Sequence, residues 1–344
     1  MLDLMPTTMN QPRPRAIYWV LSLSIAAILL YYSLRGIEWG RVWQIMCGAR
    51  PEVIALALLI MTLALVLRAL RWRVLLSANS AIPAPLAFWA TAAGYFGNNV
   101  LPARAGEVVR TLIVSGRSGM SKAFVLTTAF SERVVDAIVL ITISAVVLLT
   151  LREQPGWLAA AARPFAALGF AGVLAIALLP AFESFWFRFL ARMPVPRRLR
   201  HHVEHALRQV LEGIRSFHNR GRLVRFLIYT AAIWTCDGLI TVVIARSIGL
   251  AISLPVAFLL VAGMGLGSAL PSTPGYVGIY QFVAVSILTP FGFSRTDAIA
   301  YILLFQVMNF AVICLWGMTG LAQQRRFAVS SESTSDTVCR AGEG

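Results

Sequence analysis

The stretch that decides the fold is residues 98–110, NNVLPARAGEVVR, which interrupts an apolar region with proline, glycine, asparagine and charged side chains. A second interrupted stretch, residues 267–279, reads GSALPSTPGYVGI. Both contain Leu-Pro-x-x-x-Gly, with Pro102 and Gly106 in the first and Pro271 and Gly275 in the second. Proline and glycine interrupt helices, and unpaired backbone inside a membrane is tolerated only where protein or water covers it. If the chain crosses a membrane, two such breaks indicate a polar interior.

Composition indicates that the chain does cross a membrane. Of its 344 residues, 58% are hydrophobic and 13% are charged, whereas soluble domains are about half apolar. The formal net charge is +15. Arginine-rich cytoplasmic loops account for this charge, and attraction to anionic lipid headgroups is a second cause. Since the charge is spread over several loops, nucleic-acid binding is not expected.

We predict an all-α integral membrane protein with about six full spans, each close to the roughly 17–25 residues that cross the hydrocarbon layer. The two broken regions, 86–120 and 254–293, are predicted to be re-entrant hairpins. A first hairpin that returns to its own side keeps most arginines cytoplasmic, including Arg68, Arg71 and Arg73. Kinked transmembrane helices are the alternative for both regions. The predicted spans lie near residues 16–34, 52–70, 123–150, 160–180, 226–250 and 297–321.

The order of these elements predicts two inverted repeats. The first half, residues 16–150, contains span, span, broken hairpin and span. The second half, residues 160–321, repeats this order from the opposite side of the membrane. Paired interruptions in the two halves point to the binding site of a transporter.

The remaining segments are assigned from charge and composition. Residues 1–15 are expected to be cytoplasmic, as is an arginine-rich amphipathic helix near 197–218 on the membrane surface. The tail 327–344 is rich in serine and threonine and is expected to be disordered.

Charged residues lie inside the third predicted span. Glu132 and Asp136 share one helix face at a spacing of four residues, where two carboxylates repel unless a cation lies between them. Arg133 can reach Asp136, and Arg104 or Arg110 of the first hairpin is the expected partner of Glu132. Ionisable groups in a membrane are costly and are functional candidates. A structural ion-pair network that fixes hairpin to helix is the alternative.

The first hairpin offers groups that suit an anionic headgroup. Arg104, Glu107 and Arg110 recur at every third position, close to one helix face. The arginine guanidinium is a planar fork that fits phosphate in a bidentate manner. Asn98 and Asn99 can donate and accept hydrogen bonds, or cap the following turn.

The second hairpin is polar but uncharged. Gln281 is its candidate for substrate binding, and Pro274, Gly275 and Gly278 are expected to form its turns, as Pro102 and Gly106 do in the first hairpin. Asp237, inside another predicted span, is a candidate for proton coupling or for pairing with an arginine.

Patterns for metal and nucleotide chemistry are weak or absent in the sequence. His201, Glu204 and His205 spell H-x-x-E-H, but the surrounding spacing is that of an amphipathic helix. The four cysteines form no C-x-x-C pair, so neither a disulfide framework nor a zinc site is expected. The sequence contains no nucleotide-binding loop or nucleophile elbow. We expect no catalytic residue, no metal, no cofactor and no enzymatic activity.

Three motifs together resemble the lysylphosphatidylglycerol synthase transmembrane, or flippase-like, family over residues 15–322. The pattern N-x-x-L-P-x-R-x-G-E falls on residues 98–107, E-R-x-x-D on 132–136 and P-x-x-P-G-x-x-G on 271–278. The aminoacyl-lipid synthases of this family add a soluble transferase domain, which we do not expect here, so the resemblance does not imply lysyl transfer. Stand-alone relatives are linked to the handling of lipids, including polyprenyl-linked sugars and hopanoids.

Residues and resemblance together predict a multi-pass protein of the bacterial inner membrane with both termini in the cytoplasm. It is expected to move a lipid with an anionic headgroup between leaflets. The expected ligands are membrane lipids, namely an anionic phospholipid, a polyprenyl-linked lipid or a hopanoid. Two alternatives stay open: a non-transporting membrane partner of a lipid-modifying or glycosyl-transferring enzyme, and a membrane enzyme that acts on lipids.

Overall fold

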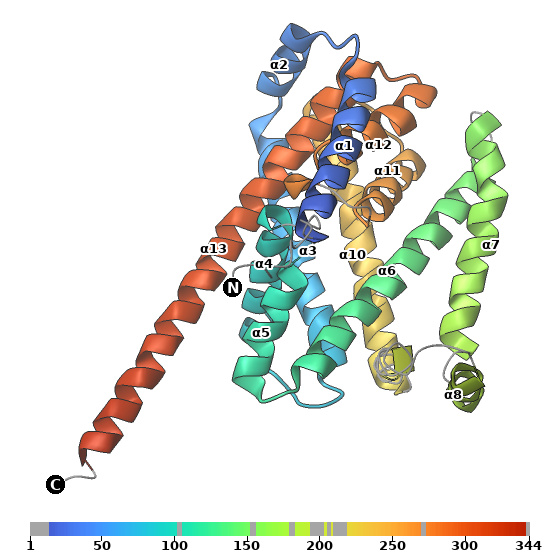
Figure 1. Cartoon of the computed structure of the whole chain (residues 1–344). Helices are drawn as coiled ribbons and strands as arrows, with labels where there is room; N and C mark the ends of the chain where they lie inside the picture. Colours follow the sequence, from blue (N-terminus) through green and yellow to red (C-terminus); the bar gives the residue numbers. More distant parts are fainter. Residues whose placement is uncertain are drawn as a thin grey trace, which may run out of the picture.

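In the computed structural model every regular element of the described chain is helical (Figure 1). The structure describes residues 14–101, 105–151, 156–178, 183–192, 203–204, 208, 219–269 and 273–341. Its elements are α1 (Pro14–Leu34), α2 (Trp39–Cys47), α3 (Pro51–Leu76), α4 (Ala84–Val100), α5 (Gly106–Ser118), α6 (Lys122–Thr150), α7 (Gly156–Leu178), α8 (Glu183–Arg192), α10 (Arg220–Ser247), α11 (Leu254–Gly267), the 3-10 turn η2 (Pro274–Tyr276), α12 (Ile279–Leu288), the 3-10 turn η3 (Thr289–Phe291) and α13 (Arg295–Ala341).

The long helices confirm the membrane class. Within the described chain, α3, α6, α10 and α13 each contain a stretch long and apolar enough to cross a bilayer, and 23–34 and α11 are shorter apolar helices. All six predicted spans fall on helices, namely α1, α3, α6, α7, α10 and α13. The chain is therefore an all-helical, multi-pass membrane protein.

Polar side chains fix where two of the long helices begin. The Oγ of Ser121 accepts a hydrogen bond from the backbone N–H of Phe124 at 3.1 Å, at the start of α6. The Oδ1 of Asn219 accepts from the backbone N–H of Arg222 at 3.1 Å, at the start of α10. Such caps satisfy backbone donors that have no partner within the helix.

The first broken region is a pair of helices, α4 and α5, whose backbones touch. A Cβ added to Gly106 would lie 1.8 Å from the carbonyl oxygen of Gly94. A Cβ added to Gly97 would lie 2.8 Å from the Cα of Gly106. Small residues allow this close approach between membrane helices, so Gly106 is required for packing.

The second broken region, α11–η2–α12, depends on glycine for a different reason. Gly275 and Gly278 have φ angles of +71° and +90°, which L-residues rarely adopt. A Cβ at Gly278 would also lie 2.7 Å from the carbonyl oxygen of Ala26 in α1. The side chain of Gln281 accepts a hydrogen bond from the Gly278 N–H at 2.8 Å and so caps α12.

The first broken pair begins and ends at one end of the bundle. Leu76, Ile82, Met120 and Val125 pack into one buried cluster, which brings the end of α3, the start of α4, the end of α5 and the start of α6 together. Figure 1 shows α4 and α5 in the half of the molecule that contains this end.

The second broken pair occupies the other half of the molecule (Figure 1). The backbone N–H of Arg50, before α3, donates to the carbonyl of Ser247, which ends α10, at 3.0 Å. Arg41 of α2 lies 3.7 Å from Asp297 in the first turn of α13. The connections on either side of α11 and α12 therefore lie at the end that carries α2. Since α4 also contacts η2, the two breaks meet inside the bundle.

Two loops contain helices that the sequence analysis did not predict. The predicted loop 35–51 contains α2, whose Trp39 and Trp43 side chains are exposed. The predicted loop 181–225 contains α8. Both sequences have apolar and polar residues in helical register, which favours a helix along an apolar boundary.

Two predictions concern the ends of the polar segments. The disorder expected for the tail 327–344 stays a prediction, and α13 is assigned as helix as far as Ala341. The amphipathic helix predicted near 197–218 lies outside the described residues, apart from 203–204 and 208.

Candidate functional site

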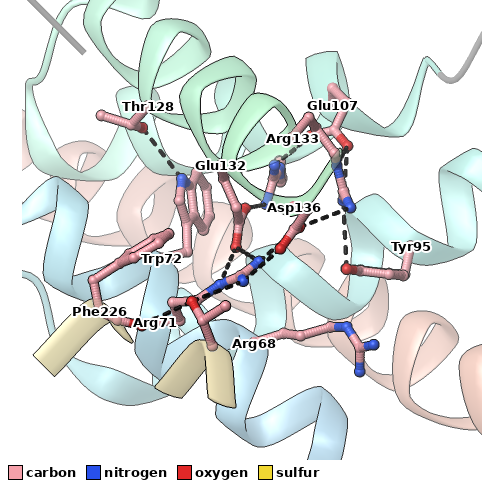
Figure 2. Close-up of polar contacts among 12 residues, drawn as sticks. Arg68, Arg71, Trp72, Tyr95, Glu107, Thr128, Glu132, Arg133, Asp136 and Phe226 are labelled. Atoms are coloured by element: carbon pink, nitrogen blue, oxygen red, sulfur yellow. Dashed lines mark hydrogen bonds and ion pairs between the residues drawn. The ribbon is translucent and has the colours of Figure 1, made fainter. Parts of the chain in front are cut away.

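A buried arginine of α3 lies at the centre of the site. Arg71 contacts both oxygens of Asp136, at 2.6 and 2.8 Å, and the Oε1 of Glu132, at 2.8 and 3.1 Å. It also donates to the hydroxyl of Thr230 at 3.3 Å, and its guanidinium lies 5.1 Å from the centre of the Phe226 ring. Figure 2 shows the guanidinium between the two carboxylates of α6. The Arg71 residue is 1% exposed, so it depends on these partners.

A second arginine neutralises the other side of Glu132. The Nη1 of Arg110, in α5, contacts the Oε2 of Glu132 at 3.1 Å. Its guanidinium lies 4.5 Å from the centre of the Trp72 ring, and Trp72 donates to the hydroxyl of Thr128 at 3.2 Å. A charge buried in an apolar interior is tolerated when it is paired and hydrogen-bonded. These contacts fix the first broken pair to α3 and α6.

A third arginine is less buried. Arg133 contacts the Oε1 of Glu107 at 3.0 Å and Asp136 at 3.9 Å, and it donates to the hydroxyl of Tyr95 at 3.4 Å. Glu107 also pairs with Arg110 at 2.5 Å. The Arg133 side chain is 27% exposed, whereas that of Arg110 is 2% exposed. Arg133 can therefore meet a ligand, while Arg110 is held within the protein.

A separate ion pair links α3 to α10, where Arg68 and Asp237 lie 2.5 Å apart with side chains 19% and 16% exposed. The ion pairs as a group join four arginines to four carboxylates, so their charges balance. Their members are Arg68, Arg71, Arg110 and Arg133 with Glu107, Glu132, Asp136 and Asp237.

A cavity of about 200 Å³ lies beside these ion pairs. Its lining includes Arg68, Arg133, Asp136 and Asp237, together with residues from α4, α11, η2, α12 and α13. Both broken pairs thus contribute to its wall. A volume of this size holds on the order of ten water molecules, which is enough for a phosphate headgroup.

The structure brings most of the predicted site residues together. Some line the cavity, and others lie behind it in the ion-pair network. Five of them line the cavity, namely Asn98, Asn99, Arg133, Asp136 and Asp237. Asn98 donates to Glu107 at 3.3 Å, and Asn99 donates to the carbonyl of Tyr95 at 2.9 Å. Glu107, Arg110 and Glu132 lie behind the cavity in the ion-pair network.

The expected contacts of Glu132 with Arg110, of Asp136 with Arg133 and of Asp237 with an arginine are all present. Gln281 is not among the cavity-lining residues. It is 3% exposed and donates to Gln306 at 2.6 Å in the second broken pair. Arg104, Pro102 and Pro271 lie outside the described residues.

Sequence reasoning missed Arg68 and Arg71. The predicted span 52–70 contained Arg68 near its cytoplasmic end and left Arg71 and Arg73 to a cytoplasmic loop, but α3 continues to Leu76. That interpretation is wrong for Arg71, which is buried between Glu132 and Asp136. Because Glu132 and Asp136 share a helix face, a cation is required between them. An arginine at the end of a neighbouring apolar helix was the sequence feature that could have identified this cation.

The part of the chain that the structure describes contains no group of three or more histidine, cysteine, aspartate or glutamate side chains that could hold a metal ion. The carboxylates of the site are paired with arginines instead. Glu204 of the H-x-x-E-H pattern is described, and His201 and His205 are not.

Fold and site together define a multi-pass membrane protein with a charge-balanced arginine–carboxylate network beside an internal cavity. The family model "Lysylphosphatidylglycerol synthase TM region" matches residues 19–317. The chain belongs to this family, which confirms the resemblance of its three motifs.

One curated relative is the protein named Glycosyltransferase AglD from Haloferax volcanii, which is 26% identical over 291 residues. The match covers 75% of this chain and 46% of that protein. This chain therefore corresponds to less than half of the length of that relative.

Proposed function

We propose that this protein moves a lipid with a phosphate-bearing headgroup between the two leaflets of a membrane. The observation that carries the proposal is the cavity between the two broken helix pairs, with Arg68 and Arg133 in its wall. Irregular backbone at membrane depth marks the binding sites of many transporters. An arginine fork suits phosphate.

The proposed arrangement in the membrane has six spans and two re-entrant pairs that form inverted repeats. It is supported by the two broken pairs, which start and end at opposite ends of the bundle. The loop with the greatest number of arginines, 181–225, follows α7 and precedes α10, at the end where α4 begins. By the positive-inside rule, this end and both termini lie in the cytoplasm, in a bacterial inner membrane.

The four arginines have two different roles in this proposal, contact with the phosphate and positioning of the carboxylates. Arg133 and Arg68 are partly exposed and contact the phosphate, while Arg71 and Arg110 are buried and hold the carboxylates in place. A phosphate that reaches Arg133 competes with Glu107 for the guanidinium. Because an exchange of one anion for another keeps the arginine paired, the charge stays compensated in the low-dielectric interior.

Leaflet exchange in liposomes that contain only the purified protein tests the proposal. A fluorescent phosphatidylglycerol and a polyprenyl phosphate should exchange faster than in empty liposomes. Arg133→Ala should slow the exchange by at least roughly tenfold, since a charge-assisted hydrogen bond contributes about 1.5–3 kcal/mol. Arg35→Ala is the matched control, because Arg35 is exposed at the end of the bundle that carries α2. Folded protein that accelerates neither lipid contradicts the proposal.

A second candidate function is supported by the relative. A match to less than half of a protein named as a glycosyltransferase fits a membrane part that works beside a glycosyl-transferring enzyme without moving lipid itself. The same assay distinguishes the two functions, since a partner of this kind gives no exchange when purified alone. A membrane enzyme that acts on lipids would instead convert the lipid, which chromatography of the liposome lipids detects.

A further inference from the structure

The carboxylates of the ion-pair network differ in the number of arginines that contact them. Within the described chain, three carboxylates contact two arginines each, namely Glu107 with Arg110 and Arg133, Glu132 with Arg71 and Arg110, and Asp136 with Arg71 and Arg133. In the same part of the chain Asp237 contacts a single arginine, Arg68. When a ligand takes one arginine away, the first three carboxylates stay paired and Asp237 does not.

The Arg68–Asp237 pair faces the cavity. Both residues line it and are partly exposed, whereas Arg71 and Glu132 are buried and lie outside its lining. Figure 2 shows the Arg68 side chain directed away from Arg71. A phosphate in the cavity can therefore reach Arg68 without breaking the buried ion pairs.

Helix packing fixes Asp237 opposite Arg68. Helices α3 and α10 share one buried cluster that contains Val74 and Phe226, and another that contains Ala57 and Ile244. The next arginine along α3, Arg71, is already bound to both oxygens of Asp136 and to Glu132. Asp237 thus has no second described arginine that is free to replace Arg68.

The other ionisable groups around Asp237 do not respond in the same way. Helix α11 contains no titratable side chain, and tyrosine and cysteine are ordinarily neutral near pH 7. Asp136 keeps Arg71 when Arg133 binds a ligand. The groups that face Asp237 are Arg68 and Arg71 of α3, Tyr95 of α4, Arg133 and Asp136 of α6, Tyr276 of η2, Tyr280 of α12 and the neighbouring Cys236.

The charge balance of the network requires compensation when a phosphate enters. The described ion pairs join four arginines to four carboxylates, and a phosphodiester adds one negative charge. An uncompensated charge in a low-dielectric interior is costly, and an unpaired carboxylate there becomes neutral by taking up a proton. Asp237 is the carboxylate that loses its arginine, so it is where a proton removes the excess charge.

We infer that each phosphate that binds Arg68 brings one proton onto Asp237, so that the lipid moves together with a proton. Arg68 breaks its ion pair with Asp237 and forms one with the phosphate. The proton comes from water and forms the O–H bond of the Asp237 carboxyl group, and the total charge of site and ligand is unchanged. When the phosphate leaves, the proton leaves and the ion pair forms again.

The two uses expected for Asp237, proton coupling and pairing with an arginine, are thus two states of one group. Arg133 differs, because its release leaves Glu107 with Arg110 and Asp136 with Arg71. This inference rests on the proposed function, and it deepens it by naming the ion that accompanies the lipid.

The test is the number of protons taken up on binding. The full chain in detergent micelles near neutral pH is titrated with dihexanoyl phosphatidylglycerol, and separately with farnesyl methyl phosphate, by calorimetry in two buffers of different ionisation enthalpy. Both probes are phosphodiesters, whose charge does not change in this pH range, so any proton taken up is bound by the protein. We expect about one proton per ligand. By linkage, the affinity should fall by up to about tenfold for each unit of rising pH.

Asp237→Asn is the informative variant, because its neutral amide replaces the protonated carboxyl group. It should bind the same probes with no proton uptake and with no loss of affinity as the pH rises. Asp297→Asn is the matched control, since Asp297 is an ion-paired carboxylate that contacts Arg41 and lies outside the cavity lining. It should keep the uptake of about one proton.

Leaflet exchange under a pH gradient gives a second measurement. The wild-type protein should concentrate labelled phosphatidylglycerol in the leaflet on the alkaline side, by up to about tenfold for each pH unit, beyond the level in empty liposomes. Asp237→Asn should exchange the lipid without concentrating it. A change in the extent of exchange alone would also follow from a structural role, whereas the proton number and the response to the gradient would not.

Binding by the wild-type protein without proton uptake overturns the coupling and leaves the proposed function standing. This measurement needs no variant, so it is decisive even where Asp237→Asn fails to fold. Binding that requires sodium in place of a proton also overturns the coupling. Equal proton uptake by wild type and Asp237→Asn overturns the assignment to Asp237. Failure of folded wild-type protein to bind either probe overturns the proposed function and the coupling together.

Discussion

The two broken helix pairs have a similar interruption and opposite chemistry. The first pair, α4 and α5, is held by charge, since Glu107 and Arg110 join the ion pairs of α3 and α6. The second pair, α11–η2–α12, is held by neutral groups. There the amide of Gln281 donates to Gln306, and Gln306 donates to the carbonyl of Gly275 at 2.9 Å.

One cavity is thus enclosed by two kinds of support, ion pairs on one side and neutral hydrogen bonds on the other. Ion pairs in an apolar interior are sensitive to the loss of any one member, because the remaining charge is left unpaired. Neutral hydrogen bonds cost less when one is lost. The first broken pair should therefore be much less tolerant of substitution than the second.

The largest effect is expected from Arg71→Met, which removes the cation between Glu132 and Asp136. Breaking a buried pair by removing one partner costs about 3–5 kcal/mol. The free energy of unfolding in mixed detergent micelles should fall by this amount. The double variant Arg71→Met/Asp136→Asn should recover most of it, because Glu132 keeps Arg110 and the network then has three arginines and three carboxylates. A loss below about 1 kcal/mol for the single variant would contradict the proposed tight coupling of these charges.

A smaller contrast is expected between glycines of the two pairs. Gly106→Ala places a Cβ against the backbone of α4 and should destabilise the protein by about 3 kcal/mol or more, the upper range for overpacking. Gly275→Ala has open space, with its nearest neighbour Val277 at 4.0 Å. It should cost about 1 kcal/mol, from the positive φ alone. The same unfolding measurement compares them, and equal costs would mean that the close approach of α4 and α5 is not required.

An effect smaller than those of Arg71→Met and Gly106→Ala is expected from Gln281→Ala, which leaves the N–H of Gly278 without its side-chain acceptor. The loss should be about 1–2 kcal/mol. Gln306→Ala tests whether the two amides act together. If they do, the double variant should be less destabilised than the sum of the single variants, whereas full additivity would show that the chain of amide hydrogen bonds has no coupled role.

Much of the fold could be predicted from the sequence, because a membrane forces apolar residues into long continuous runs. The spans and both broken regions follow from these runs and from the positions of proline and glycine. The short helices α2 and α8 could not be predicted in the same way. These helices are only 9 and 10 residues long, and their apolar residues alternate with arginines, which are typical of loops at the membrane surface.

The candidate site was predictable only in part. Glu132 and Asp136 can be recognised in the sequence because they are carboxylates within an apolar span. Their spacing of four residues predicts a cation between them. The identity of that cation depends on how far α3 extends past residue 70, which hydropathy does not determine. Gln281 was predicted as a ligand-binding residue because it is polar and lies in a broken segment, but its amide caps the backbone of its own turn. Only packing distinguishes these two uses of a polar side chain.

The most direct test of the central claim is a reversible block of the cavity. Ser268 lines the cavity and can be replaced by cysteine with a small change in volume, in a chain whose four native cysteines are serine. A benzyl methanethiosulfonate reagent then adds a bulky group, and mass spectrometry measures the extent of labelling. A chain that retains only the exposed Cys47 is the control. The account predicts that leaflet exchange stops on labelling at 268, recovers after reduction and is unaffected by labelling at Cys47. Undiminished exchange with the cavity fully labelled would contradict it.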